Sequence, residues 1–171
     1  MTTMQRTSPF DTSPAAMLSP DVQQAASRSV LCWLATVDAS GQPNVSPKEV
    51  FAVFDAQHIV VAHIASPTTV RNLQQASKVC LSFIDVFVQK GYKVAGHARY
   101  VARAHPEFAH WAQALVAMAE PRFTVHGVIV VQAQAVEPIV APSYRLYPAE
   151  TTEASQIASA LKTYGVQRAD P

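Results

Sequence analysis

Hydroxyl and basic side chains gather where an apolar, strand-like segment gives way to the start of a helix. The residues are Ser66, Thr68 and Thr69, with Pro67 between the hydroxyls and Arg71 further on. Serine followed by proline is a common helix start, with Ser66 as the N-cap. A helix N-terminus also carries free N–H groups and a partial positive charge, so it binds anions readily. The segment therefore predicts either an ordinary capped helix or half of a phosphate site.

A second polar group interrupts an apolar segment upstream. Ser46, Pro47 and Lys48 lie inside NVSPKEVFAVF, which otherwise has the composition of a strand. Proline cannot donate a ladder hydrogen bond, so Pro47 marks a sheet edge, a bulge or a backbone that turns towards a ligand. Lys48 is either an ordinary solvent-exposed lysine or the point charge that the helix start lacks. A lysine needs only reach to contact a phosphate.

Two further positions are candidates for ligand contact. Lys90 and Gly91 stand at the entrance of a strand, where Gly91 would let the backbone approach a flat heterocycle closely. The alternative is a turn with a solvated lysine. His63 ends a strand shortly before the helix start, and we interpret it either as a ligand contact or as a half-buried, hydrogen-bonded histidine.

The sequence lacks the common catalytic and metal-binding patterns. His105 and His110 are five residues apart, and no HExxH or His/Cys ligand spacing occurs. No Ser-His-Asp or Cys-His arrangement can be assembled from neighbouring residues, and neither GxGxxG nor GxxxxGK[ST] is present. We therefore expect no metal site and assign no catalytic residue.

Composition favours one globular domain. The chain has 171 residues, of which 49% are hydrophobic and 15% charged, and its formal net charge is +1. No basic block points to nucleic acid or to a membrane surface. The N-terminus lacks the apolar core of a secretory signal, and the apolar runs are too short to span a bilayer, so we expect a soluble cytoplasmic protein. Cys32 and Cys80 lie in apolar runs and are expected to be buried rather than part of a disulfide framework.

Periodicity and turn residues predict a mainly β chain with flanking helices. We expect a flexible N-terminal arm over residues 1–18, one domain over 19–150 and a C-terminal helical extension over 151–171. Both tryptophans, Trp33 and Trp111, are predicted to be core residues. The short turns and irregular alternation favour an antiparallel barrel over a parallel sheet. Strands are expected near 30–37, 44–54, 58–64, 78–88, 92–102 and 122–139, and helices near 19–28, 68–76, 105–120 and 150–166.

Three segments together resemble one protein family. They are LATVDASGQPNVSPKEV, IASPTTVRNLQQASKVCLSFID and FVQKGYKVAGHARYV, and the resemblance covers roughly residues 29–138. They are similar to the FMN-binding split-barrel proteins, which are also called pyridoxamine-phosphate-oxidase-like. The resemblance implies a six-stranded antiparallel split barrel and a homodimer. It also implies one FMN in each of two clefts at the subunit interface.

The same resemblance assigns roles to particular segments. The strand matching VSPKEV lies along the flavin, the turn matching SPTT holds the phosphate, and the region matching QKGY approaches the ring. Together with Arg71 as a further source of charge, the expected cofactor-binding residues are Ser46, Pro47, Lys48, His63, Ser66, Thr68, Thr69, Arg71, Lys90 and Gly91.

Departures from the family pattern argue against oxidation of vitamin B6. The oxidase has an Arg-Lys pair where this chain has Thr68-Thr69, and an arginine where it has Ser46. Its substrate-binding Arg and His have no counterpart in APSYRLYPAE. We expect an FMN-dependent oxidoreductase that acts on an unidentified small molecule. The alternatives are a non-catalytic flavin carrier or redox sensor, and a relative that binds deazaflavin F420 or haem in the same cleft.

Overall fold

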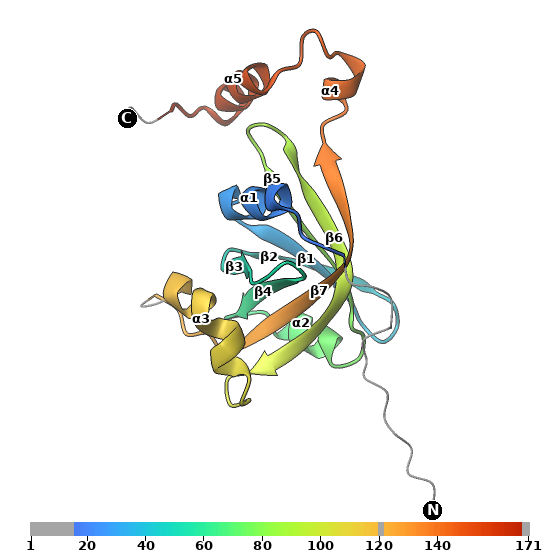
Figure 1. Ribbon diagram of the computed structural model, residues 1–171, viewed down its shortest axis with the longest axis vertical. Helices are drawn as coiled ribbons and strands as arrows, with labels where there is room; N and C mark the ends of the chain where they lie inside the picture. Colours follow the sequence, from blue (N-terminus) through green and yellow to red (C-terminus); the bar gives the residue numbers. More distant parts are fainter. Residues whose placement is uncertain (1–15, 120–121, 169–171) are drawn as a thin grey trace, which may run out of the picture.

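The computed structural model describes residues 16–119 and 122–168. These residues form an antiparallel sheet with helices packed around it (Figure 1). The strands are β1 (Cys32–Val37), β2 (Pro43–Lys48), β3 (Phe51–Val53), β4 (His58–His63), β5 (Lys78–Asp85), β6 (Lys90–Ala102) and β7 (Gly127–Val140). The helices are α1 (Pro20–Arg28), α2 (Pro67–Leu73), α3 (Phe108–Ala119), α4 (Ser143–Leu146) and α5 (Glu153–Tyr164).

The sheet has the order β2-β1-β5-β6-β7-β4-β3, and each neighbouring pair is antiparallel. Its two edge strands, β2 and β3, follow each other in the chain and are separated only by Glu49 and Val50. Because two residues bridge the two edges, the sheet must curl until those edges approach each other. The fold is thus a curled, antiparallel half-barrel, which fits the expected split barrel.

The number of strands differs from the prediction. The segment 44–54 was expected to form one strand, but it divides at Glu49 and Val50 into β2, which pairs with β1, and β3, which pairs with β4. The structure therefore has seven strands rather than six. Composition did not reveal this break, because the division depends on which strand each half pairs with.

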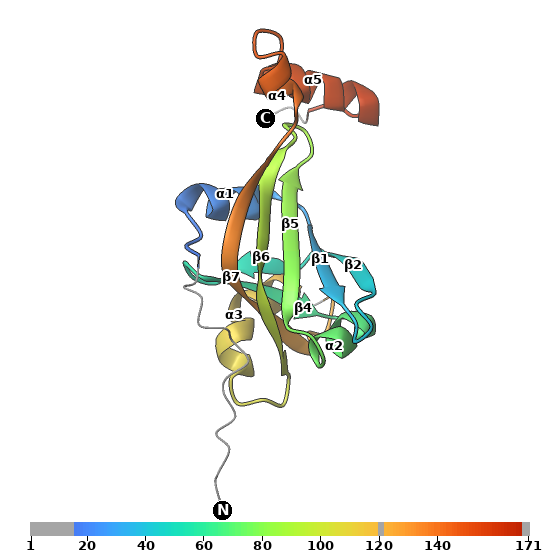
Figure 2. The same cartoon turned by 90° about the vertical axis from the view of Figure 1, so that its right-hand side faces the viewer.

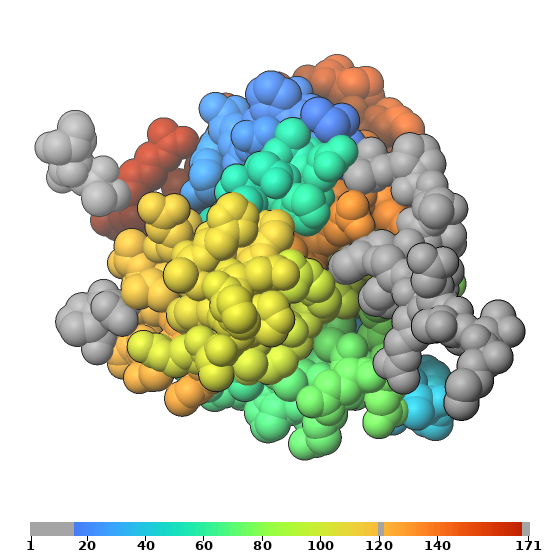
Figure 3. All heavy atoms as spheres, turned by 60° about the horizontal axis from the view of Figure 1, so that its bottom comes forward, coloured from blue at the N-terminus to red at the C-terminus, as the bar shows by residue number. Residues whose placement is uncertain are grey.

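Two apolar cores fill the two faces of the sheet. One lies inside the curl and includes Leu34, Ile59, Leu81 and Val94. The other lies between β4, β7 and α3 and is centred on Leu115. Figure 3 shows α3 and the turn before it filling the middle of one end of the molecule, with the region of α2 beside them. Helix α3 thus seals the face that the curled sheet turns outwards.

Trp33 does not belong to either core, which corrects the prediction. Its side chain is 45% exposed on the outer face of β1, whereas Trp111 packs partly buried against the second core. Trp33 alternates with the buried Cys32 and Leu34, so strand pleating turns it to the opposite face. Both cysteines are free, and Cys80 pairs across strands with Ala35 rather than with Cys32.

The two ends of the described chain join this barrel at different places. Of the predicted arm, residues 1–15 lie outside the described residues, but Leu18 is buried in the first core and its N–H donates to Ala56. At the other end, α4 and α5 stand off the sheet, at the end opposite α2 (Figure 2). Gly165 terminates α5 with φ +64°, as the sequence predicts. No helix of the described part of the chain is long and apolar enough to cross a membrane.

Candidate functional site

Lys48 is a lysine held inside the curled sheet. It ends β2 on the inward face, opposite Cys32, and only 5% of it is exposed. No acidic side chain among the described residues forms an ion pair with it. Burial lowers the pKa of its amine because the charged form loses water. A buried amine without an acidic partner is an unusual and costly arrangement in a folded protein.

Ser66 provides the hydrogen-bonding partner of this lysine. The amine of Lys48 donates to the Ser66 hydroxyl oxygen. Ser66 occupies the N-cap position of α2, but its side chain makes no capping hydrogen bond. The prediction that Ser66 caps the helix with its side chain is therefore wrong, since the hydroxyl is turned to Lys48 instead.

A buried set of hydroxyl and amide groups holds α2 against the sheet. The hydroxyls of Ser46 and Thr69 lie 3.1 Å apart, and Thr69 is almost completely buried. The amide of Asn72 donates to the Thr36 hydroxyl at 3.0 Å. These contacts fix the turn that carries Ser66 relative to the strand that carries Lys48.

The other two side chains predicted at this helix start lie on its exposed side. The guanidinium of Arg71 donates to the Thr68 hydroxyl at 3.0 Å, and both residues are exposed. They therefore lie outside the buried group of Lys48, Ser46 and Thr69. Arg71 would have to break its hydrogen bond to Thr68 before it could donate all of its N–H groups to a ligand.

A pocket of about 250 Å³ opens beside the Lys48 amine. Glu49 and Ser66 join Lys48 among its polar lining residues, and Pro47, Ile64 and Phe123 supply apolar walls. Cofactor pockets are typically about 300–1,000 Å³. The pocket of one chain is therefore large enough for part of a nucleotide but small for a whole one.

His63 lies near this lysine. Its Nδ1 is 3.1 Å from the Tyr100 hydroxyl, and the two rings meet edge to face with centroids 5.4 Å apart. Burial lowers the pKa of His63, and the nearby His126 and Lys48 lower it further. The imidazole is therefore pushed towards its neutral form, in which one ring nitrogen is an acceptor.

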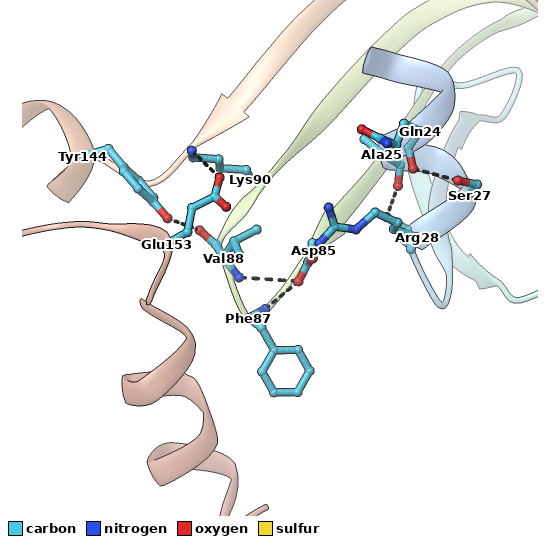
Figure 4. Close-up of polar contacts among 11 residues, drawn as sticks. Gln24, Ala25, Ser27, Arg28, Asp85, Phe87, Val88, Lys90, Tyr144 and Glu153 are labelled. Carbon is cyan, nitrogen blue, oxygen red and sulfur yellow. Dashed lines mark hydrogen bonds and ion pairs between the residues drawn. The ribbon is translucent and has the colours of Figure 1, made fainter. Parts of the chain in front are cut away.

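Lys90 and Gly91 lie far from this group within one chain. The amine of Lys90 donates to Glu153 at 2.8 Å and lies 4.4 Å from the centre of the Tyr144 ring (Figure 4). Lys90 begins β6, whereas His97 of that strand contacts Ser77, just after α2. At 3.3 Å per strand residue, about 23 Å separate Lys90 from His97. The predicted residues thus form two groups at different ends of the sheet.

Gly91 has a structural role of its own. A Cβ atom at this position would lie 2.1 Å from the backbone oxygen of Phe83 on β5. Glycine is required here by the close approach of two strands, whether or not a ligand is nearby.

Comparison with protein families identifies the fold that carries this geometry. A family model described as pyridoxamine 5′-phosphate oxidase matches residues 18–139, which include every predicted site residue. The chain belongs to this family. The oxidase-family match ends near the last residue of β7, so α4 and α5 lie beyond it. No curated protein matches the chain.

Several solved structures share this fold. HupZ of Group A Streptococcus has a TM-score of 0.63 at 22% identity, covering 73% of this chain and 96% of that one. An FMN-binding protein of Syntrophomonas wolfei has a TM-score of 0.59 at 16% identity, and the match covers 68% of this chain and 82% of that one. HutZ of Vibrio cholerae, described as a haem storage protein, has a TM-score of 0.53 at 22% identity. The match covers 72% of this chain and 94% of that one. At these identities the likeness concerns the fold of this oxidase-family chain and no more.

Several residues around Lys48 escaped sequence analysis. Tyr100 was covered only by the strand predicted near 92–102, and Asn72 and Thr36 carry no motif at all. Phe123 was assigned to a strand, but it precedes β7 and lines the pocket. Their roles depend on contacts between distant segments, which local periodicity does not contain. Among the described residues, no three His, Cys, Asp or Glu side chains lie together in a way that would hold a metal ion.

Proposed function

We propose that this oxidase-family protein binds FMN with its phosphate at Lys48 and Ser66, and that it is a flavin-dependent oxidoreductase acting on a small molecule. One observation carries the proposal. Lys48 is a buried amine without an acidic partner among the described residues. A bound phosphate would supply the missing negative charge in an environment where charge attraction is strong.

The hydrogen bonds around Ser66 suit the same anion. Because the Lys48 amine donates to the Ser66 oxygen, the Ser66 hydroxyl proton remains free to be donated to a phosphate oxygen. Its own helix does not use that hydroxyl as a cap. The amine and the hydroxyl would thus serve the phosphate together, in place of the Arg-Lys pair that this chain lacks.

A second copy of the chain would complete the site. The outer face of β1 and β2 exposes Trp33 and Val45, and Trp33 pairs across strands with the exposed Pro47. An apolar hollow of about 440 Å³ continues this face towards Val30 and Val86. Exposed apolar surface of this kind favours association. In the proposed homodimer the pocket beside Lys48 is extended by the partner, and the partner's Lys90 and Gly91 approach the ring.

The chemistry would be divided between cofactor and protein. A bound flavin supplies electron or hydride transfer. Lys48 and Ser66 would hold the phosphate, and Ile64 and Phe123 would exclude water from one side of the pocket. The binding residues would thereby fix the ring relative to the substrate, which is the protein's contribution in such enzymes.

Absorbance of the purified protein tests the proposal. We expect flavin bands in the wild-type protein, or after incubation with FMN and removal of excess, and their loss in Lys48→Met. A Soret band after incubation with haem, with no flavin retained, would favour the haem-binding alternative. A protein that retains only F420 would favour the deazaflavin alternative. A colourless protein that takes up none of the three would refute the site.

Reduction of the bound flavin separates an enzyme from a carrier or sensor. We expect bleaching of the flavin bands on addition of NADH or NADPH under anaerobic conditions, and recovery of colour with an electron acceptor. Retention of FMN with no response to either donor would favour the non-catalytic alternative.

A further inference from the structure

Tyr100 reaches His63 across an intervening strand. Strand β7 lies between β4 and β6, and Gly127 of β7 is the partner of both His63 and Ala102. The phenol of Tyr100 lies diagonally over Gly127, since Tyr100 itself pairs with Ile129. A Cβ atom at residue 127 would stand 2.4 Å from the Tyr100 hydroxyl oxygen. The contact between Tyr100 and His63 therefore exists because residue 127 has no side chain.

The hydrogen bonds of the phenol determine where the imidazole carries its proton. The Tyr100 hydroxyl donates to the backbone oxygen of His126 at 3.3 Å, and a carbonyl oxygen can only accept. The same phenol oxygen lies 3.1 Å from Nδ1 of His63. Tyr100 has one proton, so both contacts are hydrogen bonds only if Nδ1 carries a hydrogen and donates it. In neutral His63 the other nitrogen, Nε2, then keeps its lone pair.

The charges around His63 act in the same direction. Lys48, buried nearby, and His126, whose ring centre is 6.2 Å away, both disfavour a positive charge on the imidazole. Tyr100 contributes a neutral phenol, because burial raises its pKa. The neutral form of His63 is therefore favoured, and in that form Nε2 is the acceptor nitrogen.

We propose that Tyr100 is a positioning residue that fixes His63 in the Nδ1–H tautomer, so that Nε2 accepts a hydrogen bond from a hydroxyl of the ligand anchored at Lys48. This inference rests on the proposed function. Lys48 would select an anion, and His63, which is near enough for the charge of Lys48 to lower its pKa, would select a hydrogen-bond donor. A phosphorylated polyol, such as the ribityl phosphate chain of FMN, offers both groups side by side. His63 would thereby recognise the chain of the nucleotide rather than its ring.

The tautomer can be measured without any ligand. Imidazole nitrogen chemical shifts of the full-length protein at pH 8 are compared with those of Tyr100→Phe, with His63 assigned by its loss in His63→Gln. We expect a protonated Nδ1 and an unprotonated Nε2 in the wild type, and a shift towards Nε2–H in Tyr100→Phe. Gly127→Ala, which displaces the phenol, should give the same shift. An Nε2–H wild-type His63, or a tautomer unchanged in both variants, would overturn the assignment.

A double-mutant cycle with FMN tests the link to the ligand. We expect Tyr100→Phe and His63→Ala each to raise the FMN dissociation constant by about threefold to tenfold, the range for one hydrogen bond. The double variant should be no worse than His63→Ala, because Tyr100 acts through His63. If the loss of FMN affinity in the double variant equals the product of the two single losses, the two residues act independently and the proposal is refuted. Tyr164→Phe, in an exposed tyrosine of α5, is the matched control and should bind as the wild type does.

The two measurements separate two kinds of failure. If the wild-type protein shows the Nδ1–H tautomer but binds no FMN, the proposed function is wrong and the ligand role of His63 falls with it. If FMN binds at Lys48 but neither His63 nor Tyr100 affects its affinity, only the present inference is refuted.

Discussion

The amine of Lys48 donates to the hydroxyl of Ser66, and this contact joins the end of β2 to the start of α2. Both groups depart from their usual roles. A lysine is usually exposed to solvent, and a serine at the N-cap usually caps its own helix with its side chain. Both departures from ordinary local structure occur at the same pocket. Local departures of this kind are expected at functional or strained sites.

Replacement of Lys48 should separate binding from stability. Lys48→Met keeps the length and apolar stem of the side chain but removes the amine. We expect FMN affinity to fall by about tenfold to a hundredfold, the range for a charge-assisted hydrogen bond. The free energy of unfolding should stay equal or rise, because an uncompensated buried amine is removed. Flavin fluorescence titration and urea denaturation measure the two quantities. A Lys48→Met protein that loses stability and keeps its FMN would contradict both expectations.

The pH dependence of stability provides an independent check on Lys48. Its pKa is lowered by burial in the folded state, below the value of 10.5 for an unperturbed lysine. Between these two pKa values the unfolded chain binds more protons than the folded one, so stability should rise with pH in that window. The gain should be absent in Lys48→Met. Identical stability profiles of the two proteins between pH 8 and about 10.5 would show that the amine is not destabilised by burial.

A charge on the outer sheet face should prevent association. Trp33→Glu places a carboxylate at the centre of the exposed apolar surface that includes Val45. We expect the wild-type protein to sediment as a dimer and Trp33→Glu as a folded monomer with little bound FMN. Met118→Glu, at an exposed apolar position on α3, is the control and should remain dimeric. A Trp33→Glu dimer with full flavin content would show that this face is not the interface.

The N-terminal boundary can be tested by two deletions that differ by three residues. Removal of residues 1–15 keeps Leu18, whereas removal of residues 1–18 takes out a side chain buried in the first core. We expect the shorter deletion to melt close to the full-length protein. The longer one should lose about 2–5 kcal/mol, as for loss of a buried leucine. Equal melting temperatures for the two proteins would place Leu18 outside the cooperative core.

The C-terminal extension should fold onto the barrel without being needed by it. The family match ends at residue 139. Tyr144 of α4, which precedes the extension, donates to the Val88 oxygen of the β5–β6 turn at 2.9 Å. A chain that ends at residue 148 should unfold cooperatively, as followed by circular dichroism. The pair of Lys90 and Glu153 is exposed, so its loss should cost little. Aggregation of the shortened chain at low concentration would assign α5 to the core structure.

Most elements of the fold could be predicted because their signals are local. Ser19-Pro20 starts α1 with a side-chain cap, and Gly165 ends α5 in the left-handed region, both as the sequence indicates. The division of β2 from β3 could not be predicted, because it depends on which strand each half pairs with. Trp33 was misplaced for the same reason. Its strand alternates, but only the fold determines which face is covered.

The site was predictable in its parts rather than in its arrangement. Lys48 and Ser66, 18 residues apart, lie in contact, and the resemblance had named both as expected cofactor-binding residues. Lys90 is held by Glu153 at the other end of the sheet, from a segment outside the resemblance. Tyr100 depends on the missing side chain of Gly127, a relationship between two strands that no motif records.

Only Glu49 and Val50 connect β2 and β3, the two strands at the borders of the sheet. Lys48 is the last residue before this two-residue connection. A molecule bound to its amine would therefore lie at the seam of the barrel, the line along which β2 and β3 approach each other. Capture of the ligand and closure of the seam would then reinforce each other. In the protein without ligand, the backbone amides of β2 and β3 should exchange early with solvent, because both are edge strands. Once a ligand occupies the seam, the same amides would become some of the slowest to exchange.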